Sequence, residues 1–356
     1  GALGMSTGLE YSTGQYAATP EVAELAKVLG RRGGYYASHI RNRDVRLLES
    51  IAELLDIVRQ GGCAGQVSHL NVRHDTGAPS GAWRDAVEML DVARRDGVDV
   101  EADTTPFRQG LGMMIGLLPQ WLLSQGFETV ADQLGDAAVR QRLRGDCDRY
   151  WRFIHKGQWG RVRLQSSPQF PQWSGMSMPG IAEQAGKDEW DCYFDIVAAA
   201  GSGMGDLLFV GDLFTEEHLA EMIAHPLFSL GVDAMTSSTS EPLASVTTSP
   251  LSYRGHVEYL ARHVRELHTL SLEQAVHKMS GKPAARFGLK ERGLVREGWY
   301  ADLVVFDPHA VDSRSTFEHP AAYPDGIEAV VVNGRLTVDA GAHTGARAGS
   351  VLRHGG

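Results

Sequence analysis

Cysteine is scarce in this sequence, and the spacing of the few that occur excludes a disulfide framework. Cys63, Cys147 and Cys192 lie far apart and form no C-x-x-C pair, whereas disulfide-stabilised secreted domains carry many closely spaced cysteines. We therefore expect reduced thiols in the cytoplasm.

The chain also opens with GALGMSTGLEYSTG, which lacks the basic and then apolar segments of a secretory signal peptide. This Gly-, Ser- and Thr-rich opening resembles a turn inside a folded region, so we expect the front of a longer chain to be missing.

Two further absences exclude whole classes of partner. The 34 Lys and Arg residues are outnumbered by 44 Asp and Glu residues, giving a net charge of −10, so the basic surface typical of nucleic-acid binders is not expected. No run of about 18 uninterrupted apolar residues occurs, because Pro119 and Gln120 interrupt the most apolar stretch. A chain of 356 residues, 43% of them hydrophobic, is long enough for one large domain or two medium ones. We expect a soluble protein with a small-molecule substrate, and neither a nucleic acid nor a membrane as partner.

Short β-rich runs alternate with amphipathic runs along most of the chain, which is typical of βα units around a parallel sheet. Residues 34–40 are predicted as a strand and 43–59 as a helix with apolar residues three and four apart. The other predicted elements are strands at 64–70, 98–103, 161–167, 206–211 and 228–233, and helices near 80–95 and 215–226.

Two segments depart from this alternation. Residues 104–160 are rich in Met and Trp without a strand period, which indicates an inserted helical lid or substrate loop. Residues 286–356 are rich in Gly, Pro and β-branched residues. Within them, VVNGRLTV at 331–338 is two short strands across an Asn-Gly turn, the strongest short-range hairpin signal. We expect a separate β element there.

Three side chains that can carry chemistry follow predicted strands. His39 and His69 each end one, and Asp233 ends another in the phrase LGVD. In an α/β barrel the carboxyl ends of the strands collect the catalytic groups. Two imidazoles and a carboxylate suit a divalent metal such as Zn²⁺, and the carboxylate can also act as a general base. With 14 histidines in the chain, ordinary polar residues remain the alternative interpretation.

Several motifs together resemble the D-aminoacylase (N-acyl-D-amino-acid deacylase) branch of the amidohydrolase superfamily, and the match spans almost the whole chain. They are STGLEY at 6–11, GGYYASHIRNR at 33–43, QVSHL at 66–70, SLGVD at 229–233, the run from SLEQAVHKM to ADLVVFDP at 271–308, and VVNGRLTVDAG with its continuation at 331–353. The resemblance implies an α/β fold, an amidohydrolase-type (β/α) TIM-like barrel at 1–285 that is incomplete at its N-terminal side. A small C-terminal β-sandwich element is implied at 286–356.

The same resemblance implies a function. It predicts a hydrolase acting on non-peptide C–N bonds, a metal-dependent enzyme that cleaves the linear amide of an N-acyl-D-amino acid, with one or two zinc ions. His39 and His69 correspond to the histidines that hold the tighter metal, and Asp233 to the general base and a further ligand. Arg254 is a candidate clamp for a substrate carboxylate because its guanidinium offers a fork of donors, although an ordinary surface arginine is the alternative.

The sequence also departs from the family pattern. No His-x-His occurs in the 356 residues, Cys63 precedes the strand that ends at His69, and Thr105 stands where a phenol is common. Alternatives therefore stay open: hydrolysis of a cyclic amide, as in hydantoinases and dihydroorotases, or a non-catalytic or complementing chain. A homo-oligomer or a complementing N-terminal segment is a possible partner.

Overall fold

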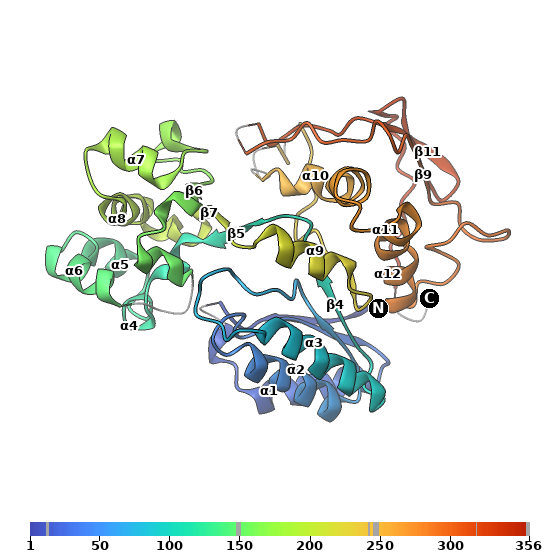
Figure 1. The fold of residues 1–356 in the computed structure, drawn as a ribbon, viewed down its shortest axis with the longest axis horizontal. Coiled ribbons are helices and arrows are strands. Elements are labelled where there is room, and N and C mark those ends of the chain that lie inside the picture. Colours follow the sequence, from blue (N-terminus) through green and yellow to red (C-terminus); the bar gives the residue numbers. More distant parts are fainter. Residues whose placement is uncertain (12–13, 147–150, 241–242, 245–248, 318, 354–356) are drawn as a thin grey trace.

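The computed structural model describes residues 1–356 apart from 12–13, 147–150, 241–242, 245–248, 318 and 354–356. Figure 1 shows a parallel sheet with its helices, an inserted lobe, and a C-terminal region that ends in an antiparallel sheet. Cys63 and Cys192 are buried free thiols, whereas Cys147 lies outside the described residues. Over the described ranges, no helix is both long and apolar enough to cross a membrane.

The first sheet has five strands, all parallel, in the order β1-β2-β3-β4-β8. Their bounds are β1 Gly4–Gly8, β2 Tyr35–His39, β3 Ala64–Val67, β4 Val100–Thr104 and β8 Phe228–Leu230. The expected strands at 34–40, 64–70, 98–103 and 228–233 are thus confirmed. Each is shorter than predicted, and β4 ends one residue beyond its predicted end. The opening segment, interpreted from sequence as a turn, is instead strand β1. Thr7 holds it to β2 through hydroxyl contacts of 2.7 Å with Tyr36 and 2.9 Å with Ser38.

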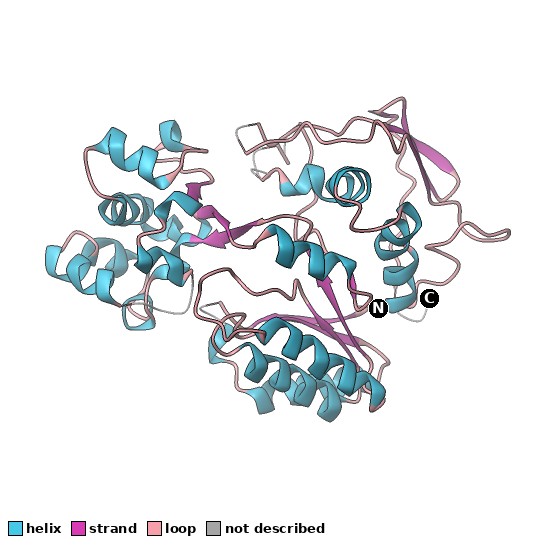
Figure 2. Ribbon diagram, viewed as in Figure 1, coloured by secondary structure: helices cyan, strands magenta, loops and turns pink. Residues whose placement is uncertain are grey.

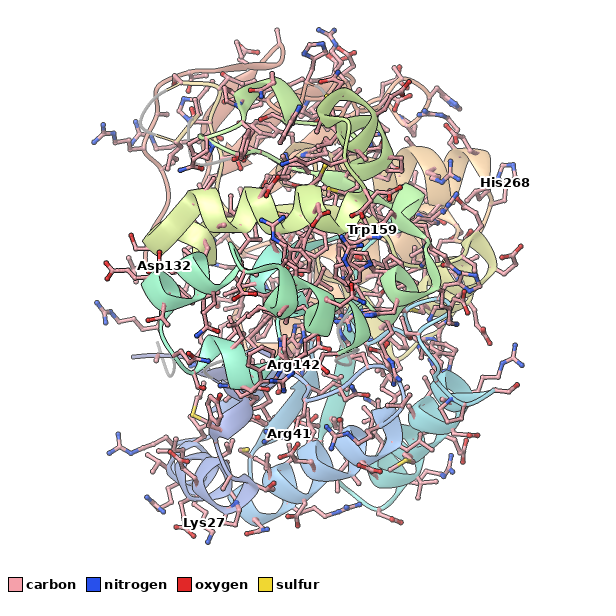
Figure 3. All side chains as sticks on the ribbon, turned by 90° about the vertical axis from the view of Figure 1, so that its left-hand side faces the viewer. Lys27, Arg41, Asp132, Arg142, Trp159 and His268 are labelled. Atoms are coloured by element: carbon pink, nitrogen blue, oxygen red, sulfur yellow. The ribbon has the colours of Figure 1, made fainter. Side chains whose placement is uncertain are left out.

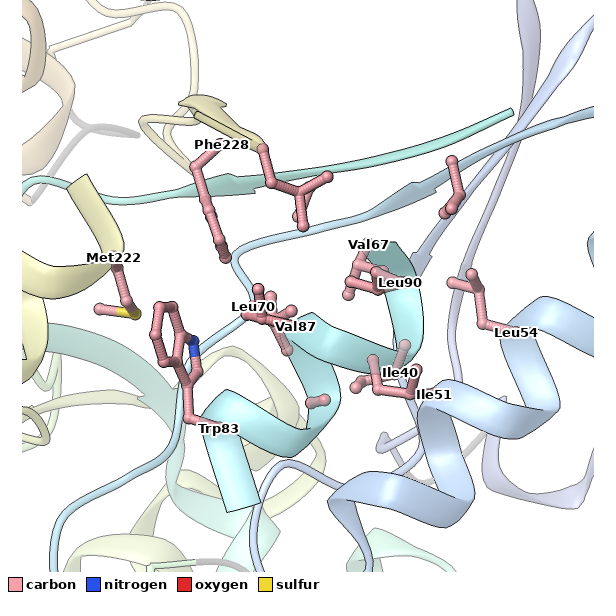
Figure 4. Packing of buried hydrophobic residues seen from close by; sticks show 14 of the residues in the cluster. Ile40, Ile51, Leu54, Val67, Leu70, Trp83, Val87, Leu90, Met222 and Phe228 are labelled. Carbon is pink, nitrogen blue, oxygen red and sulfur yellow. The ribbon is translucent and has the colours of Figure 1, made fainter. Parts of the chain in front are cut away.

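Three helices cover one face of this sheet, as Figure 2 shows for the lower part of the molecule. They are α1 Thr19–Gly30, α2 Leu47–Gly61 and α3 Ala82–Arg95. Helix α2 turns Ile51 and Leu54 inward, because apolar residues three and four apart share a helix face. Figure 4 shows them in a core that also contains Trp83, Met222 and Phe228. This core fixes the strands whose ends carry the candidate site.

The inserted lobe is larger than the sequence indicated, and it corrects two of the predicted barrel strands. Residues 161–167 and 206–211 contribute β6 Val162–Leu164 and β7 Leu208–Asp212. Strand β7 lies in the middle and pairs antiparallel with β6 on one side and with β5 Gln109–Met113 on the other. They therefore belong to a separate three-stranded sheet. The helices of the lobe are α4 Gln120–Leu123, α5 Phe127–Gln133, α6 Ala137–Gly145, α7 Met178–Ala185 and α8 Glu189–Ala200. In the turned view of Figure 3, Asp132 and Trp159 of this lobe lie above Arg41, which follows β2.

After the lobe the chain returns through α9 Glu216–Ala224 to β8 and then continues as a series of helices. These are α10 Leu251–Glu258, the π-helical turn η7 Tyr259–Glu266, α11 Leu272–Met279 and α12 Gly281–Arg286. Helix α11 begins with a complete capping box between Ser271 and Gln274, a reciprocal bonding that a serine followed three residues later by a glutamine favours.

The C-terminal region forms an antiparallel sheet in the order β12-β11-β10-β9. Its strands are β9 Leu303–Phe306, β10 Ile327–Val332, β11 Arg335–Asp339 and β12 Ala342–His343. Asn333 and Gly334 both have positive φ, at 48° and 76°, as a two-residue hairpin turn of the primed type requires. The predicted hairpin is confirmed.

The parallel sheet is open. Among the described residues β1 pairs with β2 alone and β8 with β4 alone, so these five strands form a curved sheet with two edges and no closed barrel.

Candidate active site

The predicted histidines meet at the carboxyl ends of the parallel strands. His39 is the last residue of β2, and His69 follows β3 by two residues. His39 Nδ1 and His69 Nε2 are 3.1 Å apart, and both side chains are more than nine-tenths buried. Asp233, three residues after β8, places Oδ2 3.9 Å from His69 Nε2. The fold thus brings the two histidines into contact and places Asp233 beside His69.

The hydrogen bonds around the two rings define a chain of donors. Arg43 Nη1 lies 2.9 Å from His69 Nδ1, and because a guanidinium only donates, this nitrogen is the acceptor. The N–H of His69 is then on Nε2 and points at His39 Nδ1. His39 in turn carries its proton on Nε2, which donates to Glu10 Oε2 at 2.7 Å. Tyr11 Oη is a second neighbour of His39 Nδ1, at 3.1 Å.

A buried ion-pair network lies behind His39. Arg73 Nη2 is 2.5 Å from Glu10 Oε2, and its Nη1 is 3.1 Å from Asp44 Oδ2. The side chains of Arg73, Glu10 and Asp44 are each at most 1% exposed. Thr76 Oγ1 donates to Asp44 Oδ1 at 2.7 Å. These contacts fix the Glu10 carboxylate in the position where His39 needs an acceptor.

The electrostatics keep both imidazoles neutral at neutral pH. Burial, with Arg43 nearby, lowers the pKa of His39 to about 4 and holds the pKa of His69 well below its usual value. Burial alone would raise the pKa of Glu10, but Arg73 and the His39 hydrogen bond bring that pKa well below the usual range. The site therefore contains two neutral imidazoles supported by an ionised carboxylate. Neutral imidazole is the form that binds metals.

Asp233 differs from the histidines because its side chain is 66% exposed at the mouth of the site. Surrounding protein still desolvates its carboxylate, which raises the pKa of Asp233, while Arg43 opposes that shift. Its backbone φ of 54° is in the left-handed region, which Asp tolerates better than most residues. A carboxylate in this position is open to solvent and to a small ligand.

Asp103 at the end of β4 holds the backbone of His69. Its Oδ1 accepts the His69 backbone N–H at 2.8 Å, and its Oδ2 accepts from Gln66 Nε2 at 2.8 Å. His69 has φ 37°, an uncommon conformation for a non-glycine residue. Burial raises the pKa of Asp103 to about 6, against the lowering effect of these two hydrogen bonds. The carboxylate leaves no room for a side chain at position 231, where a Cβ would be 2.3 Å from Asp103 Oδ1.

We expect Gly231→Ala to destabilise the fold by about 1–3 kcal/mol, the usual cost of overpacking. The added methyl would push Asp103 from the position in which it binds the His69 backbone. The matched control is Gly203→Ala, because a Cβ there has no neighbour within 4 Å. Urea unfolding of the two variants checks this expectation, and equal midpoints would contradict it.

Arg254, the predicted substrate clamp, is held by its own helix. Its Nη2 lies 2.5 Å from Glu258 Oε2, one helical turn away, and its guanidinium is 5.5 Å from the ring centre of Phe107. Its side chain is 25% exposed. Substrate binding by Arg254 stays a prediction.

The sequence analysis missed four charged residues of this site: Glu10, Arg43, Arg73 and Asp103. Asp103 lies at the end of a predicted strand, so the rule that selected His39 also covered it, whereas Glu10 follows β1, a strand that the sequence analysis did not predict. Among the described residues, no three His, Cys, Asp or Glu side chains are assembled closely enough to form a metal site. His39 and His69 are thus brought together, with Asp233 near His69 but outside such a set.

Comparison with known proteins shows which proteins this chain resembles. Residues 185–338 match the amidohydrolase family model. An N-acyl-D-glutamate deacylase of Alcaligenes xylosoxydans xylosoxydans is 31% identical over 338 residues, covering 94% of this chain and 57% of that protein. A D-aminoacylase of the same organism is 30% identical, covering 99% of this chain and 61% of that protein. The chain therefore spans about three-fifths of the length of these relatives.

Solved structures show the same relationship. An N-acyl-D-glutamate deacylase from Bordetella bronchiseptica, crystallised with zinc and a phosphonate mimic of the tetrahedral intermediate, superposes with a TM-score of 0.72 at 28% identity. The alignment covers 95% of this chain and 60% of that one. A D-aminoacylase structure gives a TM-score of 0.74 at 26% identity, covering 98% and 62%. The resemblance found in the sequence is confirmed: the chain is a homologue of the N-acyl-D-amino-acid deacylases of the amidohydrolase family.

Proposed function

We propose that this chain carries the active site of a metal-dependent amidohydrolase that cleaves the linear amide bond of an N-acyl-D-amino acid. The observation that carries the proposal is the convergence of His39 Nδ1 and His69 Nε2, 3.1 Å apart at the ends of adjacent strands, with Asp233 beside them. The relatives named as N-acyl-D-glutamate deacylase and D-aminoacylase support this substrate class. The enzyme is a hydrolase of non-peptide C–N bonds.

The spacing of the two nitrogens fits a shared zinc ion. Two nitrogens that each bind zinc at about 2.0–2.1 Å in a tetrahedron lie about 3.3 Å apart, close to the 3.1 Å between His39 Nδ1 and His69 Nε2. His39 and His69 would hold the ion, and Asp233 is the nearest further ligand in this chain. One or two ions fit the proposal, since a related D-aminoacylase is described as having a binuclear metal centre. Bound zinc would polarise the scissile carbonyl and lower the pKa of a water molecule.

The chain's own residues then supply the proton transfers and the binding of substrate. Asp233, exposed at the mouth and next to His69, takes the proton of the attacking water and returns it to the leaving amine nitrogen. Arg254 binds the substrate carboxylate in this proposal, which requires its guanidinium to exchange Glu258 for the substrate.

We also propose an architecture and a cellular location for this chain. The five parallel strands are part of an amidohydrolase-type (β/α) barrel within residues 1–285, and the antiparallel strands within 286–356 belong to a β-sandwich element. The parallel order of the five strands and the antiparallel order of β9–β12 support this division. Buried free thiols at Cys63 and Cys192 support a cytoplasmic location.

Zinc content and turnover of the same purified chain test the proposal. We expect about one to two zinc ions per chain after reconstitution, hydrolysis of N-acetyl-D-amino acids, and loss of both in His39→Ala/His69→Ala. A chain that takes up no zinc would overturn the proposal. Zinc binding with turnover of a hydantoin alone would favour the cyclic-amide alternative. Zinc binding without any turnover would favour a non-catalytic or complementing chain.

A further inference from the structure

We infer that Glu10 is a positioning residue for metal binding: it fixes the tautomer and the orientation of His39, and Arg73 and Asp44 hold it in place for this purpose. The inference rests on the proposed metal site and extends it to residues that do not touch the ion. These residues form a hydrogen-bonded network behind His39.

Glu10 and His39 form a short, buried hydrogen bond. Glu10 Oε2 accepts the His39 Nε2 proton at 2.7 Å, with the Glu10 side chain 1% exposed and that of His39 8% exposed. A histidine with its proton on Nε2 has its free lone pair on Nδ1, the nitrogen that faces His69. Glu10 therefore turns the ligating nitrogen toward the site. A carboxylate bound to the outer nitrogen of a ligating histidine is a general device that raises ligand basicity and fixes the ring.

The second step is that Glu10 is itself held rigidly. Arg73 contacts it with both terminal nitrogens, at 2.9 Å and 2.5 Å, and such bidentate pairs fix the plane of a carboxylate. Asp44 holds the same guanidinium from another side at 3.1 Å. A buried Arg–carboxylate cluster is not in itself a strong source of stability, so its position directly behind His39 points to a role in orientation.

The two histidines differ in what lies behind them. His39 has an anionic acceptor, whereas His69 has Arg43, a cation that donates to its outer nitrogen. That contact keeps the N–H of His69 on Nε2, so His69 has to move its proton to Nδ1 and give up the Arg43 bond before Nε2 can bind an ion. His39 is already in the ligating tautomer. We therefore place the anchoring half of the site at His39 and Glu10.

The test measures zinc affinity of Glu10→Gln by competition with a chelator. We expect a loss of about 10- to 100-fold, the usual effect of removing such an outer partner. The matched control is Glu53→Gln, which removes a carboxylate that is 12% exposed from its pair with Arg41 but leaves the contacts of Glu10 with His39 and Arg73 in place. Its zinc affinity should equal that of the unmodified chain. The visible spectrum of the cobalt-substituted protein should change in Glu10→Gln and not in Glu53→Gln.

The outcomes separate this inference from the proposed function. If the unmodified chain binds no zinc, the proposed function fails. If it binds zinc and Glu10→Gln binds equally well with the same cobalt spectrum, the role of Glu10 is wrong. Equal losses in Glu10→Gln and Glu53→Gln would also overturn it, because they would indicate a general structural effect. Should Glu10→Gln fold poorly, Glu10→Gln/Arg73→Gln removes both charges together, and the same loss of zinc affinity is expected.

Discussion

Replacing Asp233 with asparagine should lower the turnover of an N-acyl-D-amino acid by about 10²- to 10⁴-fold, the usual contribution of general acid–base catalysis. Asparagine keeps the size of the side chain and most of its hydrogen bonding but cannot take a proton. The fold should be unaffected, because the Asp233 side chain is 66% exposed and Asn tolerates its φ of 54° as well as Asp does. Turnover and melting temperature of the same preparation are the measurements.

The matched control is Asp75→Asn, since Asp75 also has a positive φ, at 63°, but bonds to Lys156 and Gln158 and not to His39 or His69. Its turnover should equal that of the unmodified chain. A folded Asp233→Asn variant with full turnover would exclude Asp233 from the mechanism and favour its alternative role as a strand-end residue.

The pH profile gives an independent check on the same residue. A general base works only when deprotonated, and desolvation raises the pKa of Asp233 above its usual value. The rate should therefore fall as the pH drops through this raised pKa. In Asp233→Asn the remaining slow rate should lose that acid limb. His39, with a pKa lowered to about 4, is present in both proteins, so an acid limb that disappears in Asp233→Asn belongs to Asp233.

The sequence was most informative where the signal is local. Strands β2, β3 and β4, the capping box at Ser271 and the Asn333–Gly334 turn each follow from residues next to one another in the chain. His39 and His69 could be paired because consecutive parallel strands place their carboxyl ends side by side.

The features that the sequence analysis missed depend on distant partners. Strand β1, of sequence GMSTG, has no apolar alternation, and its pairing with β2 defines it. The segments of β6 and β7 look like barrel strands locally, since a helix follows β7, and their antiparallel ladder cannot be read from either segment alone. Glu10 and Arg73 are 63 residues apart, and an ion pair between two loops leaves no periodic pattern.

Replacing Arg73 with methionine should destabilise the fold by about 3–5 kcal/mol, the usual cost of removing one partner from a buried ion pair. Arg73 is 1% exposed and is the cation bound to both Glu10 and Asp44, which are themselves at most 1% exposed. Methionine fills much of the same volume, so the measured decrease in the free energy of unfolding comes chiefly from the loss of the positive charge. The matched control is Arg84→Met, whose ion pair with Glu221 is as short, at 2.7 Å, but lies on the surface with Arg84 76% exposed. No measurable change is expected there.

The pH dependence of this loss distinguishes a charge effect from a packing effect. In the unmodified chain Arg73 and His39 outweigh burial and hold the pKa of Glu10 well below its usual value. Ionised Glu10 therefore contributes stability above its unfolded pKa, and this contribution is lost as the pH falls through the folded pKa. Without Arg73, fewer interactions oppose the effect of burial on Glu10, so the pKa of Glu10 rises. The buried negative charge of Glu10 then lowers the free energy of unfolding at neutral pH. The deficit of Arg73→Met in urea unfolding should then be smaller at about pH 5 than at about pH 7.5. A deficit equal at both pH values would assign the loss to packing and contradict the electrostatic role given to Arg73.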